Sequence, residues 1–236
     1  RRIDVRNDDV CLRRRRLNQP ILQNKDHLMY YEIATMTLPF GTAAQAASQV
    51  QAFCSAPEAG GELLGCWFTD IGTLNQMLVL RGFPDVARLQ AERQRTQDGG
   101  NAFGCGSIYQ SLTLESYRAF PWMRPVRPTA ESGLLGPVYE IRTYGIKPDG
   151  VQPTIDLWQQ FVPEREKISP CIIAMVALDG PLRFTNIWAY PSLDARSKAR
   201  AEAVAQGIWP PKGGPAWLTT AMTSTIALPT PVSPLR

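Results

Sequence analysis

The chain has 236 residues, of which 44% are hydrophobic, enough to bury a core as one larger domain or as two of about 100 residues each. Its formal net charge of +4 arises within residues 1–27, which hold eight basic and four acidic side chains, so the remaining residues balance at 17 of each sign. Beyond residue 27 the chain therefore lacks the basic footprint of a nucleic-acid-binding domain. No apolar run approaches the roughly 18 residues of a membrane span.

Residues 1–28 show no apolar periodicity and contain the run Arg13–Arg16. We interpret them as a basic, disordered leader, or as upstream translated sequence with Met29 as the natural start, and expect their deletion to leave folding unchanged. An RNA-binding arm is the alternative, because arginine-rich segments can fold on RNA. The acidic residues among them argue against a mitochondrial presequence.

The rest of the chain repeats itself. The pentapeptide Tyr-Glu-Ile-Ala-Thr at 31–35 returns at 139–143 as Tyr-Glu-Ile-Arg-Thr, an offset of 108 residues. Similar echoes at offsets of 107 and 108 link Phe83 with Tyr190 and Phe120 with Leu228. The repeat predicts two domains, at 29–122 and 137–236, joined by a linker at 123–136.

In the first copy, strand and helix patterns alternate in a defined order. Strands are predicted at 29–38, 63–69, 74–81 and 107–120, with helices at 42–55 and 85–97.

The second copy predicts the same order. Strands are expected at 138–146, 170–178, 182–190 and 218–228, and helices at 151–162 and 192–206. Pro163 should end or kink the first of these helices, because proline removes a backbone donor.

The order strand, helix, strand, strand, helix, strand is the ferredoxin-like plan, with helices on one sheet face and the other face bare. Two such units in one chain can cover their bare faces by packing sheet to sheet. We therefore predict an α+β fold of tandem ferredoxin-like (βαββαβ) units.

Three segments of the second copy resemble the NIPSNAP family of dimeric α/β-barrel proteins. They are Tyr139–Tyr144 with the following Lys-Pro, Trp188–Tyr190, and the Pro-rich end at 229–235. The resemblance covers 29–235 and implies that the tandem copies form an intramolecular dimeric α/β barrel. In the first copy Ala34, Met36 and Arg81 replace the equivalents of Arg142, Tyr144 and Trp188, so any functional pocket should lie mainly on the second copy.

Relatives of this barrel fold that bind haem commonly use a histidine ligand. The single histidine, His27, lies outside the repeats, so we expect neither haem nor any other cofactor, and no metal site. The five cysteines form no C-x-x-C pair and are interpreted as buried free thiols in a reducing compartment. The composition suggests a bacterial, cytoplasmic protein.

Strand alternation places Glu140, Arg142 and Tyr144 on one sheet face. We expect this polar face to point into the barrel interior and, with Asn186, Trp188 and Tyr190, to bind a small planar or anionic ligand. The candidate ligand-binding residues are Arg142, Tyr144, Asn186, Trp188 and Tyr190.

A structural alternative is that Glu140 and Arg142 pair with each other as buried ions, and we favour it over a ligand site. A further hypothesis is catalytic. Glu32 and Glu140 are equivalent by the repeat, so this hypothesis has them approach each other across the pseudo-two-fold axis as an acid–base pair, and we rank it below binding. The basic helix residues around Arg196, Lys198 and Arg200 are interpreted as a solvated face.

Three functions remain open. The first is a NIPSNAP-like protein, without demonstrable enzyme activity, that binds a small molecule or a protein partner through the barrel interior. The second is a cofactor-independent monooxygenase or isomerase acting on a small aromatic or keto substrate. The third is an interaction scaffold, which a filled interior would favour. The pseudo-dimer is also a candidate for further homodimerisation, and we expect no nucleic-acid or membrane partner.

Overall fold

The computed structural model describes residues 30–133 and 136–236, so the predicted leader lies outside the described part. The first copy contains β1 (Tyr30–Thr37), α1 (Ala43–Cys54), β2 (Glu62–Ile71), β3 (Gln76–Phe83), α2 (Val86–Asp98), the 3-10 turn η1 (Ala102–Gly104) and β4 (Ser111–Ala119). A short helix α3 (Thr129–Ser132) lies in the connection. The second copy contains β5 (Val138–Ile146), α4 (Val151–Glu166), β6 (Cys171–Ala177), β7 (Arg183–Tyr190), α5 (Leu193–Ala205), the turn η2 (Gly214–Trp217) and β8 (Leu218–Pro229).

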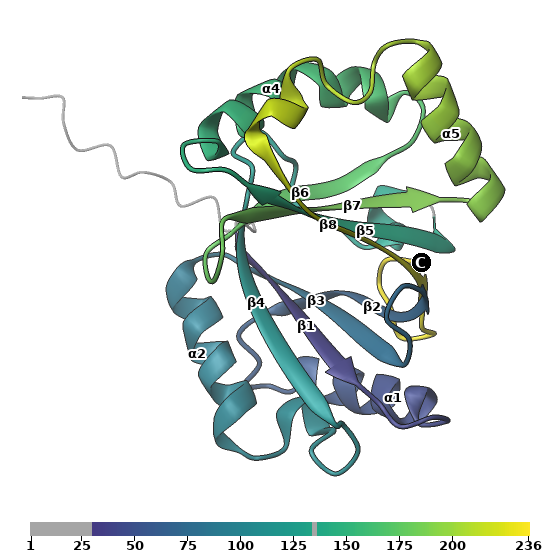
Figure 1. Cartoon of the computed structure of the whole chain (residues 1–236). Helices are drawn as coiled ribbons and strands as arrows, with labels where there is room; N and C mark the ends of the chain where they lie inside the picture. Colours follow the sequence, from purple (N-terminus) through teal and green to yellow (C-terminus); the bar gives the residue numbers. More distant parts are fainter. Residues whose placement is uncertain (1–29, 134–135) are drawn as a thin grey trace, which may run out of the picture.

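The eight strands form one closed antiparallel barrel in the order β1-β3-β2-β8-β5-β7-β6-β4. Each copy supplies four neighbouring strands, and the copies join at two seams, β2 with β8 and β4 with β6. Figure 1 shows the two sheets stacked in the middle, with α1 and α2 outside one and α4 and α5 outside the other. The predicted tandem ferredoxin-like barrel is confirmed. Among the described residues, no helix has the length and apolar character needed to cross a membrane.

The barrel interior is packed with apolar side chains from both copies. They include Tyr31, Ile33, Leu64, Trp67, Leu78, Leu80, Tyr117, Tyr139, Ile141, Ile173, Met175, Ile187, Ala227 and Leu235. The rings of Trp67 and Tyr139 meet across the two sheets with centroids 5.1 Å apart. The interior is therefore a shared hydrophobic core, whose burial stabilises the contact between the copies.

Helices α2 and α5 each begin at a side-chain cap, and the helices of both copies form the outer layers (Figure 1). The side chain of Asp85 accepts a hydrogen bond from the Arg88 amide at the start of α2, and Ser192 does the same for α5. Pro163 was expected to end or kink α4. It does not end the helix, which runs to Glu166. Pro163 and Gln159, the residue four positions before it, are both exposed, so the carbonyl left without an amide partner can reach water.

The chain end seals one seam. After β8, the Thr230 amide donates to the Cys66 carbonyl (2.9 Å), the Cys66 amide donates to the Ser233 hydroxyl (3.0 Å), and the Leu235 amide donates to the Leu64 carbonyl (3.0 Å). Leu235 is fully buried in the interior core. The C-terminus consequently ends beside β2 (Figure 1), and the tail of the second copy becomes part of the first.

The two seams differ in register. Trp67 of β2 lies opposite Pro229 of β8. At the other seam Met175, the repeat equivalent of Trp67, lies opposite Ala119 rather than Pro121, the equivalent of Pro229. This slip of two residues makes the barrel asymmetric although its sequence is repeated.

The outer face of the first sheet buries an ion-pair network. Arg81 on β3, fully buried, donates to Glu32 on β1 (2.5 Å) and to Glu92 on α2 (2.7 Å). The Phe103 ring lies 4.6 Å from its guanidinium carbon. Both carboxylates are also buried; Glu32 pairs with Arg81, whereas Glu92 also pairs with Arg95 (2.6 Å).

Replacing Arg81 should expose that dependence. We expect Arg81→Met to lower the free energy of unfolding by about 3–5 kcal/mol, because buried Glu32 loses its arginine partner and Glu92 keeps only Arg95. The double variant Glu32→Gln/Arg81→Met should recover part of the loss. Urea titrations followed by circular dichroism measure both, with Arg88→Met on the exposed face of α2 as the matched control. A loss below about 1 kcal/mol in Arg81→Met would contradict a structural role for the network.

Candidate functional site

The second copy uses the equivalent carboxylate differently. Glu140, on β5, is fully buried on the outer sheet face. One of its oxygens, Oε1, accepts hydrogen bonds from Arg142 (2.5 Å), from Arg196 (2.6 Å) and from the Ser224 hydroxyl (2.9 Å). The first copy sets two carboxylates against Arg81 and Arg95, whereas the second sets one carboxylate against three arginines.

Helix α5 supplies two of these arginines. Arg196 and Arg200 are four residues apart and so share one helix face. The guanidinium of Arg200 lies 3.8 Å from Oε2 of Glu140, whereas Lys198, between them in sequence, points outward and pairs with Asp194. The prediction that Arg196 and Arg200 form a solvated face is therefore wrong, and it holds only for Lys198.

A fourth arginine lies deeper. Arg165, in the helical turn after Pro163, is 2% exposed and donates to the hydroxyls of Ser169 and, at 3.5 Å, Tyr190. Its guanidinium carbon lies 4.9 Å from the Trp188 ring centroid. Within the described part of the chain, Arg165 forms no ion pair with a carboxylate.

We call Arg142, Arg165, Arg196 and Arg200 the arginine cluster. Burial by itself would raise the pKa of Glu140, but hydrogen bonding from Arg196 and the charge of Arg142 outweigh it and lower the pKa to about 2. Burial, with the charge of Arg200, lowers the pKa of Arg165. With Glu140 ionised and the four guanidinium groups charged, the cluster carries a formal excess of three positive charges.

The predicted ligand-binding residues lie around this cluster. The Arg142 Nε donates to the Tyr144 hydroxyl, and the Asn186 amide donates to the Arg142 carbonyl (3.2 Å). The Trp188 indole donates to Asn186 (2.8 Å). Tyr190 lies beside Arg165 instead, so the structure brings the five residues onto one sheet face but divides them between two arginines.

That face is not the barrel interior, and the predicted orientation is wrong. Glu140 contacts α5, while the intervening positions Tyr139 and Ile141 belong to the interior core. Trp188 packs against Trp158 of α4 and against Trp209. A helix-covered sheet face is usually apolar, and for that reason a polar strand face is expected to point into the interior. Here arginines from helix α5 neutralise the buried Glu140 on the helix-covered face.

The proposed approach of Glu32 to Glu140 is also wrong. Their strands, β1 and β5, are separated by three strands in either direction around the barrel. Each carboxylate points outward to its own helix layer and binds its own arginines. The ion pair of Glu140 with Arg142, favoured from the sequence, is present.

Sequence reasoning missed Arg165, Arg196, Arg200 and Ser224. The i,i+4 spacing of Arg196 and Arg200 was a usable signal, since it sets them apart from Lys198. The repeat also held a signal: Leu89 stands at the position of Arg196 and Glu92 at that of Ala199, so the second helix gains a basic residue and loses an acidic one relative to the first. Arg165 was missed because the helix was expected to end at Pro163, whereas it continues through Arg165 to Glu166.

The arrangement suits binding better than proton transfer. A general base works best with a pKa near the operating pH, and that of Glu140 is far below it. Among the described residues, no group of three or more His, Cys, Asp or Glu side chains could hold a metal ion. What the cluster does offer is cationic donors: Arg142, Arg196 and Arg200 have side chains 16%, 25% and 37% exposed.

The ionisation of Glu140 should govern acid stability. Its carboxyl has a pKa of about 2 when folded, against an ordinary value of 4.5, so its contribution is complete above about pH 5 and lost as the pH falls toward 2. We expect the stability difference between wild type and Glu140→Gln to shrink from pH 6 to pH 3, by on the order of 3 kcal/mol across the full titration.

Urea unfolding at several pH values measures this difference, and Glu202→Gln, on the exposed face of α5, is the control. A difference that stays constant from pH 6 to pH 3 would show that Glu140 is not held ionised by the arginines.

Comparison with known proteins agrees with the fold. The family model described as NIPSNAP matches residues 31–102 and 139–234, more than half of the chain. The protein NipSnap homolog of Dictyostelium discoideum is 30% identical over 152 residues, which cover 64% of this chain and 66% of that protein. The matched region thus spans just under two thirds of that relative.

Solved structures share the barrel. A proposed monooxygenase from Lactobacillus acidophilus has a TM-score of 0.60 at 10% identity, covering 86% of this chain and 94% of its own. One from Fusobacterium nucleatum also has a TM-score of 0.60 at 10% identity, covering 86% and 92%. At this identity the likeness concerns the fold alone. The family match in two segments, one on each copy of the repeat, establishes that the chain belongs to the NIPSNAP family.

Proposed function

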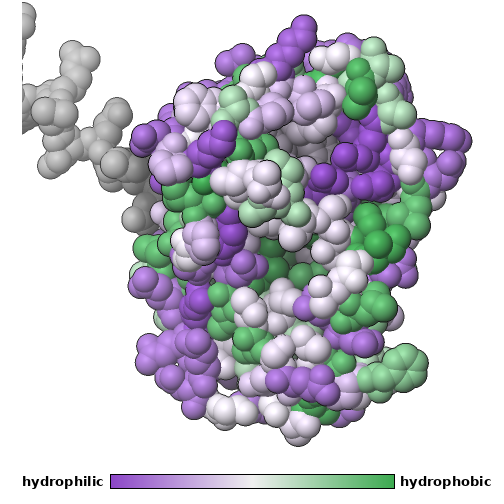
Figure 2. All heavy atoms as spheres, in the orientation of Figure 1, coloured by the Kyte–Doolittle hydropathy of each residue, from purple (hydrophilic) through white to green (hydrophobic). Residues whose placement is uncertain are grey.

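We propose that the protein binds a small oxyanion, a carboxylate or a phosphate, at the arginine cluster of its second copy. The observation that carries this proposal is the charge imbalance: Arg142, Arg196 and Arg200 surround one ionised carboxylate on a partly open surface, and the buried Arg165 adds a fourth positive charge close enough to Arg200 to repel it. Guanidinium groups bind carboxylates and phosphates through charge-assisted hydrogen bonds, which are stronger than neutral ones. Figure 2 shows hydrophilic side chains gathered next to α5, consistent with such a surface.

Donors remain for a ligand. The Nε of Arg196 is buried and has no hydrogen-bond partner within the described chain. Among the described residues, the one ion pair of Arg200 is the 3.8 Å contact with Glu140, which is too long for a direct hydrogen bond. An anion beside Arg142, Arg196 and Arg200 would use these donors and offset part of the excess charge, while the Tyr144 ring supplies an adjacent wall.

Binding is favoured over the oxygenase or isomerase alternative. A substrate held between Trp188 and Arg142 would need space beside the indole, but that ring packs on Trp209, with centroids 5.8 Å apart, and on Trp158 at 6.4 Å. The barrel interior is likewise occupied by the hydrophobic core. The fold shared with proposed monooxygenases does not by itself identify a catalytic residue. The side chains that would hold a substrate are already engaged in the ring contacts of Trp188 and in the interior core.

The charge of Arg200 should decide affinity. We expect phosphate, succinate or benzoate to raise the melting temperature saturably, and Arg200→Gln to weaken binding about tenfold, since a charge-assisted hydrogen bond is worth roughly 1.5–3 kcal/mol. Calorimetric titration at fixed ionic strength measures the affinities.

Lys198→Gln is the matched control: it removes the same charge from the same helix, but its side chain points outward. Equal weakening in both variants would mean that only the general field of the helix matters. An absence of saturable binding by all three anions would contradict the proposed function.

A further inference from the structure

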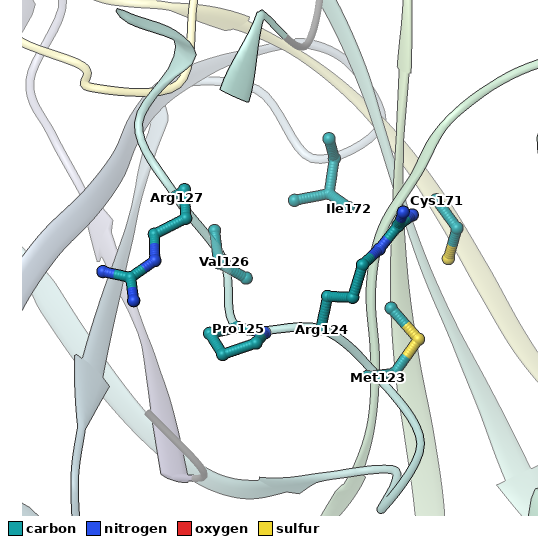
Figure 3. A pocket seen from close by; sticks show the side chains of 7 residues that line it. All are labelled: Met123, Arg124, Pro125, Val126, Arg127, Cys171 and Ile172. Carbon is teal, nitrogen blue, oxygen red and sulfur yellow. The ribbon is translucent and has the colours of Figure 1, made fainter. Parts of the chain in front are cut away.

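A pocket of about 340 Å³ lies between the connection of the two copies and the start of β6. Met123, Arg124, Pro125, Val126 and Arg127 line it from the connection, and Cys171 and Ile172 from β6. In Figure 3 the Arg124 side chain extends toward Cys171, while the guanidinium of Arg127 turns away from Ile172. Val126 and Ile172, which line the pocket, also belong to the interior core cluster, so the pocket lies at the edge of the barrel interior and apart from the arginine cluster.

Its position has an exact counterpart in the repeat. Ile172 is equivalent to Leu64, at the offset of 108. Both residues sit at a β-bulge, Leu64 between Leu63 and Gly65, and Ile172 between Cys171 and Ile173. Because the two strands have a bulge at the same place, their backbones bend in the same way, and the two strand edges present similar backbone amide and carbonyl groups.

In the first copy that edge is occupied. The C-terminal tail runs along it, and the Leu235 amide donates to the carbonyl of the bulged Leu64 (3.0 Å). The Leu235 side chain is fully buried. The edge of β2 is thus completed by an extended peptide segment with an apolar side chain, in the manner of an added strand.

In the second copy, no segment of the described chain is hydrogen-bonded along the equivalent edge in the way that the tail is bonded along β2. The Phe120 amide donates to the Ala174 carbonyl (2.9 Å), but the chain then turns, with Met123 donating back to Phe120. No backbone hydrogen bond from the connection reaches Ile172 within the described residues. The two-residue slip between the seams explains this, because it carries the connection away from β6 before it reaches the bulge.

We propose that this pocket binds an extended peptide segment of a partner protein, added to the edge of β6 as the tail is added to β2. A backbone amide of the peptide donates to the Ile172 carbonyl, and an apolar side chain lies against Met123, Val126 and Ile172. Arg124, whose side chain is 77% exposed and pairs with Glu166, stands at the rim. It favours a peptide with a carboxylate close to its apolar residue.

The chain itself supplies the probe. A synthetic peptide with the sequence of residues 229–235, Pro-Thr-Pro-Val-Ser-Pro-Leu with a free C-terminal carboxylate, is titrated into the intact protein by calorimetry. We expect saturable binding, and hydrogen exchange should slow at 171–174. The same peptide N-methylated at its leucine amide cannot donate the central hydrogen bond, and we expect its affinity to fall about tenfold.

Arg124→Gln should weaken the free-carboxylate peptide severalfold, with Arg118→Gln, on the exposed side of β4, as the control. Three results would overturn the proposal: no saturable binding, equal affinity of the N-methylated peptide, or slowed exchange confined to 64–66. The second would indicate a pocket for apolar small molecules, and the third would mean that the peptide only replaces the tail.

Discussion

Closure of two four-stranded sheets on each other is the constraint on which this structure depends. Each sheet has helices on one face only, so its other face must be buried by a second sheet. The chain meets this requirement internally, with the Trp67–Tyr139 contact at the centre and the C-terminal Leu235 sealing one end. Since the interior is used for this packing, functional side chains are left to the outer faces and to the seams.

The outer faces show how the copies diverged without changing the fold. Both keep a glutamate in the middle of their first strand, and both neutralise it with arginine. In the first copy, Glu92 adds a second carboxylate that pairs with both Arg81 and Arg95, and the Arg81, Glu32 and Glu92 side chains are buried, as expected of a structural element. In the second, Ala199 stands in its place and the added charges are arginines at a partly open surface. The same position in the fold thus changed from a closed network to a surface with excess positive charge.

The seams diverged in a different way. Pairing between the copies is short at both seams, four residue pairs for β2 with β8 and three for β4 with β6, and the two pairings differ in register by two residues. The effect of this difference is that the tail covers one bulged edge, whereas no segment of the described chain is bonded in this way along its equivalent. The two copies therefore differ in two separate ways. A difference in backbone register distinguishes the edge of β6 from that of β2, and a difference in side chains gives only the second copy the arginine cluster.

Much of the fold could be predicted from the sequence, because the repeat, the strand alternation and the turn residues all act locally. The strand faces of the site could not. Alternation correctly separates Glu140, Arg142 and Tyr144 from Tyr139 and Ile141, but it does not say which set faces inward. That depends on partners distant in sequence, chiefly Arg196 and Arg200. The difference between the edges at Leu64 and Ile172 was likewise beyond sequence analysis, since it depends on a difference in register rather than in residues.

The central claim is that the ligand site lies outside the barrel, on the helix-covered face of the second copy. A crystal structure of the protein with phosphate at physiological ionic strength tests it most directly. The account predicts an ordered anion within hydrogen-bond distance of at least two of Arg142, Arg196 and Arg200, with the interior core unchanged. An anion bound inside the barrel, or an arginine cluster without any bound anion at saturating phosphate, would contradict it.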